Sequence, residues 1–227
     1  MLRHTLADFC QFLRAPQLCP PAPLCQGRGR WAIMLGTYLA GLVVMGVALA
    51  LWQRAFHLPA PEAFGGYRLP ALVAISVLAA PPGEEALFRG WLTGRPRALW
   101  LLALALVAVA LLAAITVKWH EIAAVFGLLA LVIAAPVGCY RLRRLDTPGW
   151  FARGFGVWFH LSAVVFGLMH LTNYPRLSWA LVPMVLPQIW AGLVFGYLRM
   201  RSGLRGAILA HAVGNAATLA AALLAGH

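Results

Sequence analysis

The residues most able to do chemistry in this chain lie in stretches that are otherwise apolar. The segment "AAPPGEEALFRGWL", residues 79–92, contains Glu84, Glu85 and Arg89. A charged side chain in the middle of a membrane helix costs about 2.5–3.5 kcal/mol, and such side chains usually face a protein interior and mark function. Glu85 and Arg89 are four residues apart, so they share a helix face and can form an ion pair. Glu84 points about 100° away from that face, and the ion pair does not explain it.

The backbone before the two glutamates carries a further signal. Pro81 and Pro82 have no N–H to donate, and with Gly83 they predict a break or kink in the helix. Glu84 and Glu85 would then lie in the first turn of a restarted helix, where free N–H groups and the helix dipole favour carboxylates. A carboxylate in such a position suits a general base.

Two further apolar stretches each contain a histidine at helical spacing from a second residue. "FGLMH" contains Phe166 and His170, and "HAVGN" contains His211 and Asn215. A carboxylate can take a proton from water, one histidine can hold that water, and a histidine with an amide can donate to a developing oxyanion. The same set also fits a zinc site made of Glu84, His170 and His211, with the second glutamate as the base. The spacing does not choose between the two. We interpret the remaining candidates in or near these runs as structural: His57, His120 and His160.

The composition identifies the solvent of these stretches. Of the 227 residues 62% are hydrophobic and 11% are charged, and the mean hydropathy is +0.81. Soluble domains carry about a quarter charged residues, so we expect an integral membrane protein. Long continuous apolar runs favour helices over a barrel, whose strands alternate. The net charge of +12 does not indicate nucleic-acid binding, because the basic residues cluster between apolar runs.

The pattern predicts an all-α, polytopic membrane helical bundle of about seven transmembrane helices. Residues 1–30 are predicted to be a cytoplasmic N-terminal tail with a short interfacial helix, and residues 31–227 a transmembrane domain. Each run has about the 20 residues that a helix needs to span the apolar layer. The expected spans are Trp31–Trp52, Leu69–Leu92, Ala98–Val117, Glu121–Tyr140, Phe155–Asn173, Leu177–Leu198 and Gly206–Ala225.

The basic residues predict the topology. With seven spans, thirteen basic residues fall on one side and four on the other, with Arg89 left inside a helix. The positive-inside rule then places the N-terminus in the cytoplasm and the C-terminus outside. No signal peptide is expected. We interpret the four cysteines, Cys10, Cys19, Cys25 and Cys139, as free thiols on the reducing side, since their spacing fits no metal motif.

Three motifs in this order carry a family resemblance: "EEALFR" as EExxxR, "FGLMH" as FxxxH and "HAVGN" as HxxxN. Together they resemble the CAAX prenyl protease and bacteriocin-processing (CPBP) family of intramembrane endopeptidases. The segment "GLVFGYLRMRSGLRGAILAHAVGN" is also similar to the last conserved segment of that family. The resemblance implies a membrane-embedded peptidase, in a family described both as glutamic-type and as metal-dependent.

Carried over by position, the resemblance assigns roles to residues. It implies that Glu84 activates water, that His170 helps to hold it, and that His211 and Asn215 form the oxyanion site. Three other residues would support the site: Glu85, Arg89 and Phe166. In the family the first two motifs lie on consecutive helices, whereas here residues 98–140 stand between them and predict an inserted helix pair.

The partners expected on this basis are the lipid bilayer and a membrane-associated substrate. That substrate could be a prenylated CAAX-type protein, a leader peptide or another membrane-protein segment; no nucleic acid is expected. We expect the bacterial inner membrane as the location. Two alternatives of other classes remain: a non-catalytic scaffold or immunity protein of the same fold, and a proton-coupled transporter, in which buried glutamate and histidine relay protons.

Overall fold

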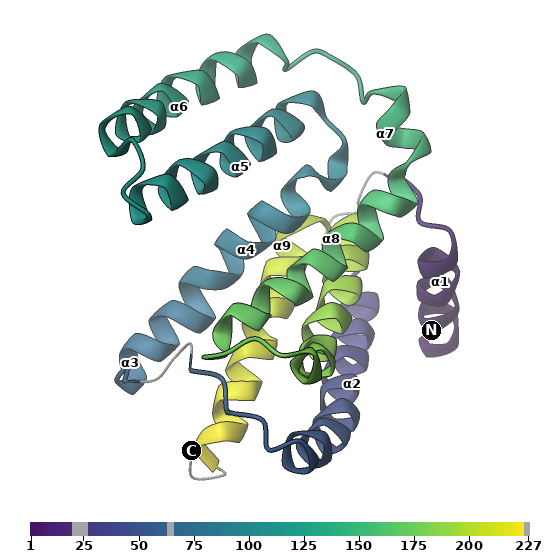
Figure 1. Ribbon diagram of the computed structural model, residues 1–227. Helices are drawn as coiled ribbons and strands as arrows, with labels where there is room; N and C mark the ends of the chain where they lie inside the picture. Colours follow the sequence, from purple (N-terminus) through teal and green to yellow (C-terminus); the bar gives the residue numbers. More distant parts are fainter. Residues whose placement is uncertain (20–26, 63–65, 225–227) are drawn as a thin grey trace. The chain divides into compact units, whose positions relative to one another are not determined.

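The computed structural model describes residues 1–19, 27–62 and 66–224 (Figure 1). Cys25 and the last residue of the predicted Gly206–Ala225 span lie outside these residues. The described chain is helical and contains no strand. It divides into two compact units, one made of residues 1–89 and 155–227 and the other of residues 90–154. The predicted sites all lie in the first unit.

The first unit contains most of the helices. Their bounds are Leu2–Arg14 (α1), Arg28–Ala55 (α2), Leu69–Leu72 (α3), Val73–Ala79 (η2), Ala80–Arg89 (α4), Phe155–Met169 (α8), His170–Asn173 (η4), Trp179–Val185 (η5) and Leu186–Leu224 (α9). The second unit contains Gly90–Thr93 (η3), Pro96–Thr116 (α5), Glu121–Arg141 (α6) and Gly149–Arg153 (α7).

Six helical stretches of the described chain are long and apolar enough to cross a membrane, which confirms the predicted polytopic helical fold. They are Arg28–Ala55, Leu69–Thr93, Pro96–Thr116, Glu121–Arg141, Phe155–Asn173 and Trp179–Leu224. The last stretch has 46 residues and covers most of the last two predicted spans. Gly203 divides it, because its backbone is non-helical with φ 79° and ψ 177°. Glycine tolerates this conformation because it has no Cβ.

The segment before the two glutamates differs from the prediction. Leu69–Arg89 runs on without the predicted break, because η2 is a π-helix that leads directly into α4. Pro81 and Pro82 lie in the first turn of α4, directly after this π-helix. Local π adjustments let a transmembrane helix tolerate proline, because they re-satisfy the backbone groups that proline frees. No acidic residue lies in that first turn. The prediction that Glu84 and Glu85 begin a restarted helix is wrong, since both lie one turn further along α4.

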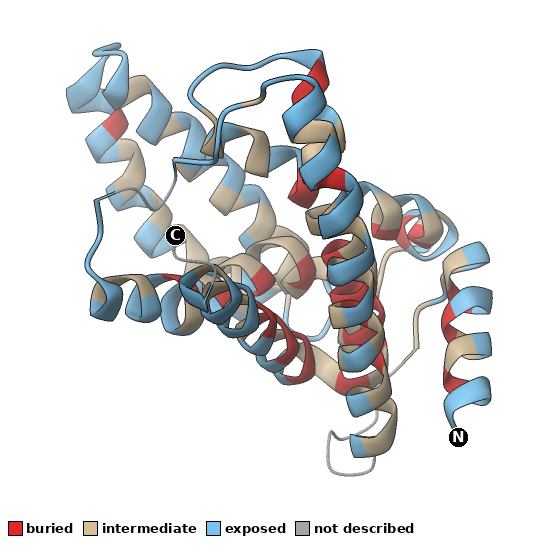
Figure 2. Cartoon of the chain, turned by 90° about the horizontal axis from the view of Figure 1, so that it is seen from below, coloured by how far each residue is buried: buried red, intermediate tan, exposed pale blue. Residues whose placement is uncertain are grey.

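Helices α8 and α9 form the packed centre of the first unit. Phe159 and Phe195, one from each helix, are almost completely buried. The two helices approach closely at Gly192, where an added Cβ would lie 2.8 Å from Cα of Ala163. Small residues allow such close approach between membrane helices. Figure 2 shows buried residues concentrated along these inner helix faces. This packing fixes the positions of α8 and α9 relative to each other.

Helix α1 is held against this centre by aromatic contacts. Phe9 and Phe12 are each 3% exposed. Phe9 lies edge-on to Trp190 and Tyr197, with ring centroids 5.8 and 5.1 Å apart, and Phe12 packs edge-on against Phe159 at 5.1 Å. Buried residues therefore lie on one side of this N-terminal helix (Figure 2).

A polar contact adds to the attachment of α1. Asp8 Oδ2 accepts hydrogen bonds from the Tyr197 hydroxyl at 2.6 Å and from Arg201 Nε at 3.1 Å, and Asp8 Oδ1 accepts one from Arg201 Nη2 at 2.7 Å. Burial alone would raise the pKa of Asp8, but the hydrogen bonds from Tyr197 and Arg201 and the Arg201 charge hold the pKa below its ordinary value.

The second unit is built on a pair of helices, α5 and α6, which pack against each other. Trp100 of α5 donates from Nε1 to the carbonyl of Ala134 on α6 at 3.1 Å. Gly138 makes room for this indole, since an added Cβ there would overlap the Trp100 ring. The unit contains the predicted insertion 98–140, whose status as an insertion stays a prediction.

Candidate active site

The first part of the candidate site is a buried ion pair on α4. Arg89 Nη1 donates to Glu85 Oε1 at 2.9 Å, and both side chains are fully buried. The Arg89 guanidinium also lies over the ring of Phe166 on α8, 4.0 Å from the centroid, where a cation–π contact stabilises it. The i, i+4 pairing that the sequence predicts is therefore present, and Phe166 lies next to it.

Helix α9 adds His211 to this pair. His211 Nδ1 lies 2.9 Å from Glu85 Oε1, so this one oxygen accepts from both His211 and Arg89 when Nδ1 carries the proton. Phe195 stacks on the imidazole with centroids 5.0 Å apart and an interplanar angle of 24°. Phe166 packs edge-on against it at 5.9 Å. These contacts fix the orientation of the imidazole and its tautomer.

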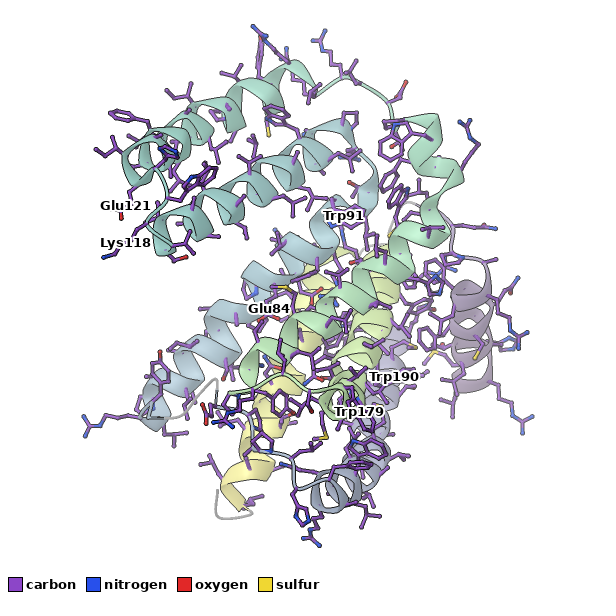
Figure 3. All side chains as sticks on the ribbon, viewed as in Figure 1. Glu84, Trp91, Lys118, Glu121, Trp179 and Trp190 are labelled. Carbon is purple, nitrogen blue, oxygen red and sulfur yellow. The ribbon has the colours of Figure 1, made fainter. Side chains whose placement is uncertain are left out.

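Glu84 has a different environment from Glu85. Its Oε2 lies 3.8 Å from His211 Nε2, which is longer than a hydrogen bond. That oxygen is buried and has no hydrogen-bond partner among the described residues, although the side chain as a whole is 34% exposed. Figure 3 shows Glu84 on α4, the helix that contacts both α8 and α9. The two adjacent glutamates therefore lie near different nitrogens of the His211 imidazole, Glu85 near Nδ1 and Glu84 near Nε2.

His170 also contacts Phe166. The ring centroid of His170 is 4.9 Å from that of Phe166, and the Phe166 centroid is 5.9 Å from that of His211. The centroids of the two imidazoles are therefore no further apart than the sum of these two distances. His170 Nδ1 lies 2.8 Å from the carbonyl of Phe166, which can fix its tautomer by accepting the Nδ1 proton. Nε2 is then left with its lone pair to accept a hydrogen bond.

Asn215 lies one turn beyond His211 on α9 and contacts the π-helix. Its Nδ2 donates to the carbonyl of Ser76 at 2.8 Å, and the Ser76 hydroxyl donates to the carbonyl of Leu72 at 2.6 Å. An amide has two N–H donors and one carbonyl acceptor, so this bond uses one donor and leaves the other. Asn215 therefore connects α9 to the segment that precedes Glu84.

The predicted zinc set does not form a ready site in this arrangement. Among the described residues, no group of three or more His, Cys, Asp or Glu side chains is placed to hold a metal ion. The zinc set of Glu84, His170 and His211 therefore stays a prediction.

Three contacts of the site involve residues that none of the three motifs contains. Phe195 stacks on the His211 ring, and the Ser76 carbonyl accepts the hydrogen bond from Asn215. Ser162 of α8 donates to the carbonyl of Phe88 at 2.6 Å. Phe195 and Ser162 sit in ordinary apolar stretches, so the sequence gives no signal for them. Ser76 is a polar residue within an apolar predicted span, and this position is the one sequence signal that it contacts another polar group.

Comparison with known families adds an independent finding. Residues 139–217 match the family model described as "Rce1-like: Type II CAAX prenyl endopeptidase Rce1-like". The match includes the motifs of His170 and His211 and begins after most of the predicted insertion. It confirms the family resemblance and supports an endopeptidase. Neither the comparison with curated proteins nor that with solved structures found a match.

Proposed function

We propose that this chain, assigned to the CPBP family by the Rce1-like match and its three motifs, hydrolyses a peptide bond with a water molecule activated by Glu84. The chain is an integral membrane protein whose helices carry the site. The substrate is then a peptide that reaches the site from the membrane.

One observation carries this proposal: the contrast between Glu84 and Glu85. Glu85 is fully buried, and its Oε1 is engaged by Arg89 and His211. Among the described residues, Glu84 Oε2 and Glu85 Oε2 both lack a hydrogen-bond partner, and Glu84 Oε2 lies 3.8 Å from His211 Nε2. The two residues differ in exposure, because the Glu84 side chain is 34% exposed and the Glu85 side chain is 0% exposed. A catalytic base must be within reach of the water it deprotonates, so the exposure of Glu84 favours it over Glu85 for this role.

The reaction would then proceed as a general-base hydrolysis. Glu84 takes a proton from water while the water oxygen attacks the peptide carbonyl carbon, with His170 holding the water. The carbonyl oxygen becomes an oxyanion that accepts hydrogen bonds from His211 and from the second N–H of Asn215. Collapse of this intermediate breaks the C–N bond, and Glu84 returns the proton to the leaving amine.

Glu85 and Arg89 support the role of His211 as a hydrogen-bond donor to the oxyanion. A protonated imidazole can donate from Nδ1 to Glu85 and from Nε2 to the oxyanion. Arg89 and that imidazolium then balance the charges of Glu84 and Glu85. Such neutrality matters because uncompensated charge is costly inside the apolar layer.

The substrate class follows from the family description. The family description names a CAAX prenyl endopeptidase, so a prenylated CAAX-type peptide is our first choice of substrate and a leader peptide our second.

The proposal is tested by cleavage in proteoliposomes. Purified full-length protein is assayed with a farnesylated CAAX peptide and with an unprenylated leader-type peptide, each carrying a fluorophore and quencher. Loss of a general base costs about 10²–10⁴-fold in rate, so Glu84→Gln should lower the rate to that extent. Glu121→Gln, in helix α6 of the second unit, is the matched control and should retain full activity.

Two outcomes would contradict the proposal. Full cleavage by Glu84→Gln would remove Glu84 from the chemistry. Loss of cleavage with a chelator and recovery with zinc would assign Glu84 to a metal-linked role instead.

A further inference from the structure

A second polar site lies in the second unit and shares no residue with the candidate active site. A cavity of about 220 Å³ is lined by two residues that flank the start of α5 and by the segment that follows α6. These residues are Arg95, Arg97, Leu142, Arg143, Arg144, Leu145, Asp146 and Thr147. Four arginines against one aspartate give the lining a formal charge of +3.

The local structure does not neutralise this charge. In the part of the chain that the structure describes, none of the ion pairs involves an arginine of the cavity or Asp146. The first turn of α5 contains no acidic residue, and its N-cap is Arg95. Cations are unfavourable at this end of a helix, where the dipole is positive. The charges of the cavity therefore reinforce the field of the helix end and favour an anion.

One arginine is already oriented for binding. The Arg143 guanidinium stacks on the ring of Tyr140 at 3.6 Å and donates from Nη1 to the Tyr140 carbonyl at 2.7 Å. A guanidinium has five N–H donors, so most of them stay free. A guanidinium can donate two parallel N–H hydrogen bonds to two oxygens of one phosphate group.

The cavity lies at one end of the helix pair. It is built from the start of α5 and the end of α6, two consecutive helices that are long and apolar enough to span a membrane. Lys118 and Glu121 mark the opposite end, at the turn between the two helices (Figure 3). Basic pockets at such ends can bind lipid head groups. The volume also exceeds the roughly 30 Å³ that one water occupies, which leaves room for a phosphate group.

We propose that this arginine-lined cavity binds a phosphate group, from an anionic phospholipid or from a soluble phosphate. This site is independent of the catalytic proposal, since it shares no residue with it. Its ligand would contact the membrane-spanning pair α5 and α6 at their common end.

The test measures ligand-dependent melting of the full chain in a neutral detergent. The probes are phosphatidylglycerol, diacylglycerol, which lacks the phosphate, and inorganic phosphate at matched ionic strength. A bound ligand raises the melting temperature according to its concentration relative to Kd. Phosphatidylglycerol should stabilise the wild type and diacylglycerol should not.

Variants locate the binding. Each arginine near a membrane surface contributes roughly a fivefold gain in affinity for anionic lipid, so R97Q/R144Q should bind about 25-fold more weakly. R54Q/R68Q removes the same charge from two exposed arginines outside the cavity and should bind like the wild type. Native mass spectrometry of retained phosphatidylglycerol gives a second readout in the wild type alone, so the test does not depend on variant folding.

The outcomes separate the sources of the phosphate. Stabilisation by phosphatidylglycerol alone supports a lipid ligand. Equal protection by millimolar inorganic phosphate supports the same site with a soluble ligand. The proposal is overturned if neither probe stabilises the wild type, or if R54Q/R68Q loses as much affinity as R97Q/R144Q.

Discussion

The buried ion pair of α4 leads to a strong prediction about stability. In Glu85→Gln, the carboxylate that accepts from Arg89 Nη1 and His211 Nδ1, each at 2.9 Å, becomes a neutral amide. Arg89 then stays as a fully buried cation without its partner. Breaking a buried pair in this way costs about 3–5 kcal/mol. We expect the lower end of this range, because the amide oxygen can still accept one hydrogen bond.

The matched comparison is Glu84→Gln. The Glu84 side chain is 34% exposed and its Oε2 has no hydrogen-bond partner among the described residues. Its loss should therefore change the free energy of unfolding by less than about 1 kcal/mol, the usual size for an exposed charge contact. For a chain of this length, the loss of about 3 kcal/mol expected for Glu85→Gln corresponds to a fall of roughly 6–12 °C in melting temperature. Melting of both variants in detergent measures this difference.

A double variant tests the reason as well as the size. If the cost comes from an unpaired cation, Glu85→Gln/Arg89→Gln should be more stable than Glu85→Gln alone, because both charges are gone. A double variant less stable than either single variant would refute the buried-charge argument. Equal loss in Glu84→Gln and Glu85→Gln would refute the division of roles between the two residues.

Two further predictions concern packing around the site. Burial works against the charged form of Asp8, but its contacts with α9 hold its pKa below the ordinary value. The ionised side chain therefore stabilises the fold by at most about 1 kcal/mol, and this contribution is present above about pH 4 and is lost as the pH falls through the lowered pKa. The melting temperatures of wild type and Asp8→Asn should differ at pH 7 and converge at pH 2. Gly192→Ala should cost about 1–3 kcal/mol, because its Cβ would lie 2.8 Å from Cα of Ala163, whereas Gly46→Ala, with no atom within 4 Å, should melt like the wild type.

The sequence was enough to predict the helices and the pairing within α4. Length and hydropathy locate membrane helices because every backbone polar group must be satisfied inside the helix. The pairing of Glu85 with Arg89 follows from the i, i+4 geometry of a single helix and is present at 2.9 Å. Such features depend on neighbouring residues only.

Features that depend on hydrogen-bond register were harder to predict. Pro81 and Pro82 suggested a break, but the π-helix Val73–Ala79 before them places both in the first turn of α4. The bend at Gly203 divides α9 without any proline, and it falls between the predicted spans Leu177–Leu198 and Gly206–Ala225. A π-turn leaves almost no pattern in the apolar residues, so hydropathy cannot reveal it.

Contacts across long sequence separations could not be predicted from spacing. His211 and Glu85 are 126 residues apart, and Asn215 and Ser76 are 139 apart. Both depend on how α9 packs against α4 and η2. The family resemblance grouped His211 with Glu84, but it did not indicate that Glu85 would contact the same imidazole.

This arrangement explains why two adjacent glutamates are needed where one would form the ion pair. Consecutive residues on a helix point about 100° apart, and the two nitrogens of an imidazole lie on different edges of its ring. Glu85 reaches Nδ1 together with Arg89, and Glu84 lies toward Nε2 with its oxygen unpaired. The two carboxylates also differ in exposure, because the Glu85 side chain is fully buried whereas the Glu84 side chain is 34% exposed. Glu85 therefore fixes the orientation of His211, and Glu84 is the carboxylate that water can reach. The adjacent pair therefore separates positioning from proton transfer at a single histidine.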